Sequence, residues 1–275
     1  MKNIKYILLL TIGLLFTACE EVVDVDLDTA PPRLVVDANI DWIKGTDGSQ
    51  QTIRLTTTGG YYENTVPPVS GAIVTVTDNN TNTVFEFIEE AGTGFYKCTN
   101  FIPVLGDSYT LTVLHEGQTY TATDTLYTTP DITRIVQNNE GGFLNEDVEV
   151  RLFFMDNGNE DNYYLTRYDT SVLPYPDYDV LDDEFFQGNE MFNFISDEDF
   201  KPGDVIHIKL HGISERYYNY MSILTELAGG GAGSGPFQTP PVNVRGNLIN
   251  QTNQKNFALG YFRLGEVTAV DYTIE

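Results

Sequence analysis

The residues best suited to chemistry in this sequence begin with two histidines. His207 and His211 stand four positions apart, which is the separation of two zinc ligands on one face of a helix. They lie in the stretch 205–211, VIHIKLH, where apolar and polar residues alternate as in a β-strand. Four residues of a strand span roughly 13 Å, whereas zinc lies about 2 Å from each nitrogen ligand, and Lys209 between them would repel a cation. We therefore predict a strand face exposed to solvent instead of a metal site, because a zinc triad would need His115 from a distant part of the chain.

Acidic residues offer two further possibilities. The segment 156–161, DNGNED, groups oxygen ligands of the kind that calcium prefers. Its glycine is third instead of sixth, and Arg167 holds the twelfth position, which excludes an EF-hand and favours an acidic turn. Whether a calcium ion binds near Asp156 is left open. The acids at 182–184, DDE, are candidates for glycoside cleavage, but neighbouring acids in one loop do not establish the facing geometry that this reaction needs.

Ser234 is the remaining candidate nucleophile. It lies in the glycine-rich run 231–235, GAGSG, and it is the fourth residue of that run. A nucleophile elbow has its serine third, in the order G-x-S-x-G, and a phosphate-binding loop needs a lysine that this run lacks. We therefore interpret the run as a flexible connection, and we predict a protein that is not an enzyme and that has no catalytic residue, metal ligand or cofactor.

Four aromatic residues point instead to binding. Tyr175, Tyr178, Phe185 and Phe186 lie in the stretch 171–188, which also holds two prolines and five acids. Aromatic rings among polar and acidic residues on a long loop are typical of a contact surface. We predict that these four rings bind a partner, and the alternative is that they pack on the core of their own domain.

Charge narrows the choice of partners. Without residues 1–18 the chain has 13 basic and 40 acidic residues, a net charge of −27. Nucleic acid is excluded as a partner, because a protein gains from counterion release only where it presents a basic face to phosphates. The negative field favours cations or serves solubility. Cys98 is the one thiol besides Cys19, so no disulfide can form within the chain if Cys19 is modified.

The first 21 residues predict where the protein resides. Residues 1–18 have two lysines, a short apolar run and small residues before Cys19, which is the pattern of a bacterial lipoprotein signal peptide. Cys19 would become the first residue and carry the acyl chains, and two or more chains hold a protein on a bilayer. Glu20 and Glu21 resemble the export signal that sends lipoproteins of the Bacteroidota to the outer face of the outer membrane. The alternative is a cleaved peptide before a soluble secreted domain.

The residues after the predicted signal peptide predict a mainly β protein. Residues 19–32 form a short acidic tether, and from residue 33 apolar and polar residues alternate between Gly- and Asn-containing turns. We predict two β-sandwich-like domains, residues 33–129 with an immunoglobulin-like or transthyretin-like fold and residues 130–275 with a single amphipathic helix. The boundary is placed at the proline of 128–131, TTPD. The expected strands are 34–41, 52–58, 72–77, 83–88, 109–114, 119–126, 132–137, 148–155, 163–168, 191–195, 205–210, 242–249, 258–264 and 267–274.

The predicted helix follows residue 212. Ser214 is a suitable N-cap, apolar residues repeat at helical spacing from Tyr217 to Leu227, and Gly229 offers a C-terminal stop. Two stretches are predicted to be long loops, 171–188 and 228–241.

Several segments of the second half resemble one known family. They are Leu173–Pro176, Asp182–Gly188, Gly203–Asp204, Ser214–Tyr220, Gly235–Phe237, Pro240–Asn247 and Ala258–Phe262. Their order is similar to that of the Bacteroidota outer-membrane lipoproteins catalogued as domain of unknown function 4249 (DUF4249), and the resemblance extends over nearly all of the chain after Cys19.

The resemblance implies an accessory role. Genes of this family often lie beside those of TonB-dependent outer-membrane transporters, and the family has no catalytic motif to carry over. We therefore expect a lipid-anchored outer-membrane protein, facing the cell exterior, that assists such a transporter without catalysis. A structural or adhesive envelope protein is the second hypothesis, and a secreted hydrolase is the third.

Overall fold

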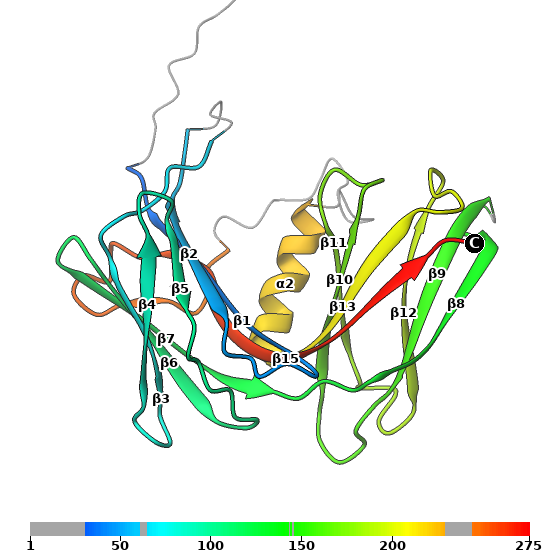
Figure 1. The fold of residues 1–275 in the computed structure, drawn as a ribbon, viewed down its shortest axis with the longest axis horizontal. Helices are drawn as coiled ribbons and strands as arrows, with labels where there is room; N and C mark the ends of the chain where they lie inside the picture. The colour runs from blue at the N-terminus through cyan, green and yellow to red at the C-terminus, as the bar shows by residue number, and fades with distance from the viewer. Residues whose placement is uncertain (1–30, 61–64, 143, 145, 229–243) are drawn as a thin grey trace, which may run out of the picture. The chain divides into compact units, whose positions relative to one another are not determined.

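The computed structural model describes residues 31–60, 65–142, 144, 146–228 and 244–275 (Figure 1). Predicted features at residues 1–18, Cys19, Glu20, Glu21, Gly229 and Ser234 lie outside this part of the chain. The described residues form fifteen strands and one helix, α2, so the prediction of a mainly β chain is confirmed. In this part, no helix is long and apolar enough to cross a membrane.

Eight strands form a closed, hydrogen-bonded ring in the first half of the fold. Residues 258–264 and 267–274, expected as two strands, form one long strand, β15 (Leu259–Thr273), which closes the ring. It runs parallel to β1 over nine residue pairs and meets β7 where Leu264 pairs with Leu126. Around the ring the order is β15, β1 (Leu34–Ile43), β2 (Gln51–Thr57), β5 (Phe95–Cys98), β4 (Val84–Glu90), β3 (Ile73–Asp78), β6 (Ser108–His115) and β7 (Gln118–Tyr127).

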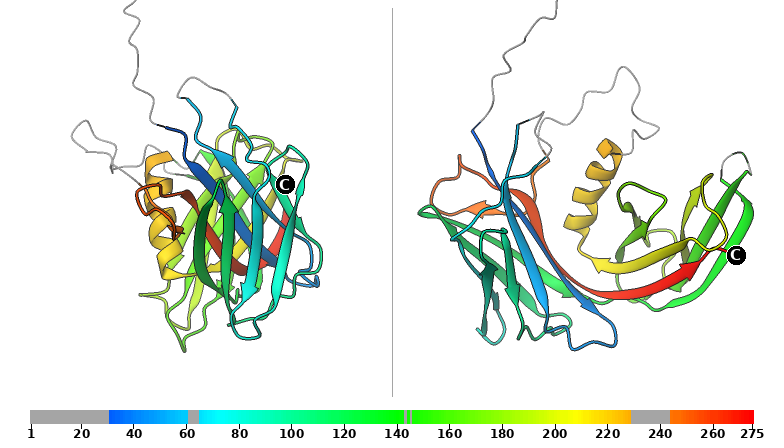
Figure 2. Two further views of the ribbon diagram at one scale, coloured as in Figure 1. Left: turned by 90° about the vertical axis from the view of Figure 1, so that its left-hand side faces the viewer. Right: turned by 45° about the horizontal axis from the view of Figure 1, so that its top comes forward.

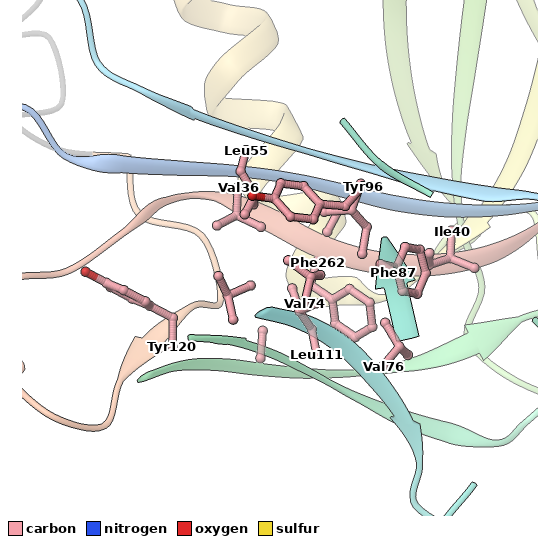
Figure 3. Packing of buried hydrophobic residues seen from close by; sticks show 14 of the residues in the cluster. Val36, Ile40, Leu55, Val74, Val76, Phe87, Tyr96, Leu111, Tyr120 and Phe262 are labelled. Carbon is pink, nitrogen blue, oxygen red and sulfur yellow. The ribbon is translucent and has the colours of Figure 1, made fainter. Parts of the chain in front are cut away.

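Alternation along the strands fills this ring with apolar side chains. In β1, Leu34, Val36, Ala38 and Ile40 are buried, while the residues between them face the other way. Phe262 of β15 is fully buried in the same cluster, together with side chains from β2 to β7 (Figure 3). Burying such a side chain contributes about 1.5–3 kcal/mol, so this core is the main source of stability for the ring.

β15 then continues beyond the ring and joins the second half of the fold. Its C-terminal part pairs antiparallel with β13 (Val205–Ile213). β13 pairs with β10 (Tyr163–Thr170), and β11 (Asp177–Asp182) is the last strand at that side of the sheet. The two-residue strand β14 (Ile249–Asn250) pairs with β7. The result is a single sheet of twelve strands.

A three-stranded sheet packs against one face of this extension. It consists of β12 (Glu190–Asp197), β9 (Asp147–Met155) and β8 (Ile132–Gly141). Leu152 and Phe154 of β9 are fully buried in one cluster with Tyr164 of β10 and Ile206 and Ile208 of β13. The even-numbered residues of β10 and β13 therefore face this second core, and their odd-numbered residues face the opposite side.

Helix α2 (Glu215–Ala228) lies over that opposite side, in the curve that β15 makes between β1 and β13 (Figures 1 and 2). The prediction of its start is confirmed, because the Tyr217 amide donates a hydrogen bond to Ser214 Oγ at 3.2 Å. Tyr217 and Met221 are its buried residues, and they pack with Leu165, Ile213 and Tyr261.

The prediction of two separate sandwich-like domains is wrong in one respect. β15, which belongs to the predicted second domain, closes the ring of the predicted first domain, and 32–275 forms one compact unit. Parallel pairing of β1 with β15 joins residues more than 220 positions apart, and alternation within each strand carries no information about that pairing. The predicted limits 33–129 and 130–275 stay a prediction.

Two further differences concern short strands. The stretch 171–188, expected to be a loop, contains β11, and β5 was not expected at all. In the described part of the expected strand 242–249, only Ile249 belongs to a strand.

Candidate functional site

A pocket of about 360 Å³ lies on the sheet face that α2 partly covers. Its sheet wall comes from β1, β15, β13 and β10, and its helical wall comes from Tyr217, Tyr220, Met221 and Leu224. This volume falls at the lower end of the range of about 300–1,000 Å³ that is usual for small-molecule sites.

Strand register brings the polar residues of this pocket together. Because β1 buries its even-numbered residues, Asp37, Asn39 and Asp41 all face the pocket. In the parallel pair with β15, Asn39 stands beside Arg263, and Asp41 stands beside Gly265, which has no side chain to fill the space. Arg263 therefore extends toward Asp41 without obstruction from its neighbour.

Asp41, Arg263 and His211 form a triad in the pocket, in which the side chain of Asp41 is 28% exposed. Asp41 Oδ1 lies 2.8 Å from Arg263 Nη1 and 3.5 Å from His211 Nδ1. The side chains of Arg263 and His211 are 6% and 1% exposed. Two buried charges are costly unless they are paired, so this arrangement is stable only while all partners are present.

The pKa values follow from this geometry. Burial alone would raise the pKa of Asp41, but the charge of Arg263 and the contact with His211 hold the pKa of this carboxyl far below its usual range. Burial lowers the pKa of His211, with Asp41 opposing that shift. At neutral pH the triad therefore consists of a carboxylate, a guanidinium and a neutral imidazole.

The prediction of a solvent-exposed face for both histidines is wrong for His211. His207 is exposed and lies 2.6 Å from Asp271, whereas His211 is buried under α2 and beside β1. Both side chains leave β13 on the same face, but the long-range pairing covers only one end of it. Among the described residues, no three His, Cys, Asp or Glu side chains are placed to hold a metal ion.

Three tyrosines form the wall above the triad. The ring of Tyr261 lies 4.7 Å from that of Tyr217 and 4.9 Å from that of Tyr220. The guanidinium of Arg263 lies 5.4 Å from the centre of the Tyr217 ring, within cation–π range. Burial, together with the neighbouring Tyr217 and Asp37, raises the pKa of Tyr220 to about 12. The wall is therefore aromatic and uncharged at neutral pH.

Sequence reasoning did not select Asp37, Asp41 or Arg263. The available signal is their position, because each is a charged residue inside a largely apolar strand segment, LVVDANIDWI for 34–43 and LGYFRLGEV for 259–267. Alternation places each on the face opposite the core, but it gives no reason to expect the three to face one pocket.

The four predicted contact aromatics do not form one patch. Tyr175 and Phe185 are 80% and 82% exposed, and Phe186 is 45% exposed. Tyr178 instead packs against the cluster that contains Leu165 and Tyr217, as the core alternative proposed for all four. β11 lies between Tyr175 and Phe185, so the two exposed sites are at opposite ends of a six-residue strand of about 20 Å. Their role in partner binding stays a prediction.

The acidic candidates are held by local hydrogen bonds. Asp156 accepts a hydrogen bond at each carboxylate oxygen, from Tyr164 Oη at 2.7 Å and from the Gly188 amide at 2.8 Å. Asp182 accepts one from Tyr218 Oη at 2.8 Å. Asp183 accepts one from the Asn162 amide at 2.9 Å. These contacts give the carboxylates a structural role in joining β9, β10 and α2 to the segment after β11.

Asp124, beside the start of α2, supports a prediction on pH. Burial raises the pKa of this carboxyl to about 6, although the Thr125 amide and Ser214 Oγ donate hydrogen bonds to it. Because this pKa lies above the unfolded value near 3.9, ionisation of Asp124 opposes folding by an amount that grows between about pH 4 and pH 6 and is complete above pH 6. We expect Asp124→Asn to raise the free energy of unfolding by about 2 kcal/mol at pH 8 and to leave it nearly unchanged at pH 4.

Urea unfolding at both pH values measures this difference. Asp199→Asn, at an exposed position of the turn after β12, is the matched control and should change neither value. An equal effect of Asp124→Asn at pH 4 and pH 8 would show that the burial of charge is not the cause.

Comparison with known proteins gives one family and no curated relative. No curated protein matches the chain. A two-domain fibronectin type-III segment of chicken tenascin is 11% identical, with 66% of this chain and 90% of that chain covered and a TM-score of 0.21. A cytokine receptor complex is 9% identical, with 87% of this chain and 95% of that chain covered and a TM-score of 0.25. A DUF4785 family protein of Legionella pneumophila is 7% identical, with 65% of this chain and 52% of that chain covered and a TM-score of 0.25.

TM-scores this low carry no argument about fold or function. The family profile, in contrast, matches residues 20–270, nearly the whole chain after the predicted signal peptide. The chain therefore belongs to the family described as domain of unknown function DUF4249.

Proposed function

We propose that this protein is a lipid-anchored lipoprotein on the outer face of the outer membrane, where it acts as a non-enzymatic accessory of a TonB-dependent transporter. The pattern of residues 1–18 before Cys19 supports the anchor, and Glu20 and Glu21 support export to the surface. The resemblance to Bacteroidota lipoproteins supports the transporter as the partner.

The observation that carries the contact role is the exposure of Tyr175, Phe185 and Phe186. Large aromatic rings that a protein keeps in water are frequent anchors at protein interfaces, where truncating one often costs about 2 kcal/mol or more of binding free energy. Asp177, Asp182 and Glu184 lie near them in sequence, and carboxylates at a rim speed association with a basic surface. We therefore place the partner contact at the two ends of β11.

We expect the triple variant Tyr175→Ala, Phe185→Ala and Phe186→Ala to lose the transporter on purification from native membranes in mild detergent. Its melting temperature should stay within about 2 °C of the wild type, because exposed side chains contribute little to folding. Tyr178 is left unchanged because its ring packs against the protein.

The matched control removes three other exposed rings, Phe95, Phe192 and Phe194, which are 37%, 41% and 45% exposed. That variant should retain the transporter. Loss of the transporter in both variants would contradict a specific contact at β11. If the wild type itself brings down no transporter, the accessory role is wrong and a structural or adhesive role takes its place.

A further inference from the structure

Two accessible charges of opposite sign face the pocket from different strands. Asp37 is an exposed residue of β1, and its carboxylate accepts a hydrogen bond from the amide of Asn39. Among the described residues, no cationic group lies within ion-pair distance of it. Arg54, which pairs with Asp37 from the neighbouring strand β2, lies with its guanidinium 5.3 Å from the centre of the Phe95 ring. Asp37 therefore enters the pocket as a carboxylate without a counter-ion in the described structure.

Arg167 provides the opposite charge from β10. Its side chain is 36% exposed, and its Nε and Nη2 both donate to Asp169 at 2.7 Å. That contact fixes the guanidinium in place and leaves Nη1 as its remaining donor nitrogen. Burial raises the pKa of Asp37 and the charge of Asp41 adds to that rise, whereas the charges of Arg263, Arg54 and Arg167 oppose it.

Part of the pocket wall is apolar. Leu165, Tyr220, Met221 and Leu224 form that part, and Asp41 forms an ion pair with Arg263 in the same pocket. The charged side chains that line the pocket are two aspartates and two arginines, and Asp169, outside the lining, is paired with Arg167. Asp41 is paired with Arg263, which leaves the carboxylate of Asp37 and Nη1 of Arg167 to face a ligand, and a ligand that carries one charge of each sign can contact both.

We infer that this pocket binds a free α-amino acid with an apolar side chain. Its ammonium group lies against Asp37, its carboxylate accepts a hydrogen bond from Arg167, and its side chain packs on Met221 and Leu224. This assignment goes beyond the transporter partnership and does not depend on it, since it concerns the residues of the pocket alone.

Four ligands with the same aromatic body separate the two charges. Phenylalanine carries both charges, and N-acetylphenylalanine amide carries neither. Phenylalanine amide carries only the ammonium, and N-acetylphenylalanine carries only the carboxylate. We expect phenylalanine to bind the purified full-length lipoprotein in detergent at least tenfold more tightly than any of the other three, as measured by isothermal titration calorimetry. An absence of phenylalanine binding up to about 10 mM, or equal binding of all four, overturns the inference.

Two variants assign each charge to its residue. Asp37→Asn should weaken the binding of phenylalanine at least tenfold and leave the binding of N-acetylphenylalanine unchanged, because the acetylated ligand has no ammonium. Arg167→Gln should weaken the binding of phenylalanine and leave the binding of phenylalanine amide unchanged. Asp271→Asn, at a 70% exposed position outside the pocket, is the control and should bind like the wild type.

Equal losses for all ligands in either variant would overturn the assignment of charges, with thermal unfolding of each variant confirming that it is folded. Failure of this experiment leaves transporter co-purification untouched, because no transporter is present in the titration. Conversely, loss of the transporter partnership would not alter the binding of phenylalanine to the pocket.

Discussion

Replacing Asp41 with alanine is expected to lower the free energy of unfolding by about 3–5 kcal/mol, because it leaves the buried charge of Arg263 without its carboxylate. Arg263 lies 2.8 Å from Asp41, and its side chain is 6% exposed, so water cannot take over the role of the lost partner. A loss of this size is a large part of the total stability of an ordinary domain, which is about 5–15 kcal/mol. Urea unfolding at pH 7 measures it.

The controls separate charge from volume. Asp41→Asn keeps the size of the side chain and should still lose most of the stability, since the charge is removed. The double variant Asp41→Leu, Arg263→Met removes both charges and should recover much of the loss, as replacement of buried ion pairs by apolar residues often does. A single variant that unfolds at the same urea concentration as the wild type would show that the pair does not stabilise the fold.

The same pair predicts a response to acid. The pKa of Asp41 is lower in the folded protein than in the unfolded chain, so its contribution is fully present above the unfolded value, near 3.9, and is lost as pH falls below it. The wild type should therefore lose stability below about pH 4 more steeply than Asp41→Asn.

Replacing Cys19 with alanine is expected to release the protein from the outer membrane almost completely. Acyl chains on this residue are the predicted anchor, and a net charge of −27 gives the protein no overall attraction to anionic lipids. Palmitate labelling and fractionation after a high-salt wash measure the change. If the variant sediments with membranes as the wild type does, the anchor prediction is wrong.

The variant Glu20→Ala, Glu21→Ala is the matched control for this experiment. It changes the two residues that follow the cysteine and leaves the acylation site intact. It should keep its label and its membrane association but become protected from protease added to whole cells. Unchanged cleavage of this variant would contradict the role of the two glutamates in export.

Residues that are neighbours in sequence carried the correct predictions. The alternation of Leu34, Val36, Ala38 and Ile40 identified β1 because the side-chain period of a strand is two. Ser214 identified the start of α2, because a serine hydroxyl caps a helix through a contact only three residues long. Such features depend on backbone geometry that a short stretch of residues determines by itself.

The exposed aromatics show the limit of this reasoning. Tyr175 and Tyr178 are three residues apart and have the same composition around them, but one ring is 80% exposed and the other packs against the core. The difference arises because β11 forms, pairs with β10 and turns Tyr178 toward Arg167, whose guanidinium lies 5.7 Å from its ring. The stretch 177–182 gives little local sign of that strand, since acids occupy half of it.

By itself, the sequence determined the mainly β character, six of the eight strands of the ring, the helix start and the negative charge, because each of these follows from the period or composition of a contiguous stretch. Only the tertiary structure decided that β1 and β15 pair in parallel, and with that pairing came the closed ring, the burial of His211 and the meeting of Asp41 with Arg263. The physical reason is that alternation fixes which face a side chain occupies but not which strand lies beside it. Where the two strands are more than 200 residues apart, that choice is made by the packing of the whole core.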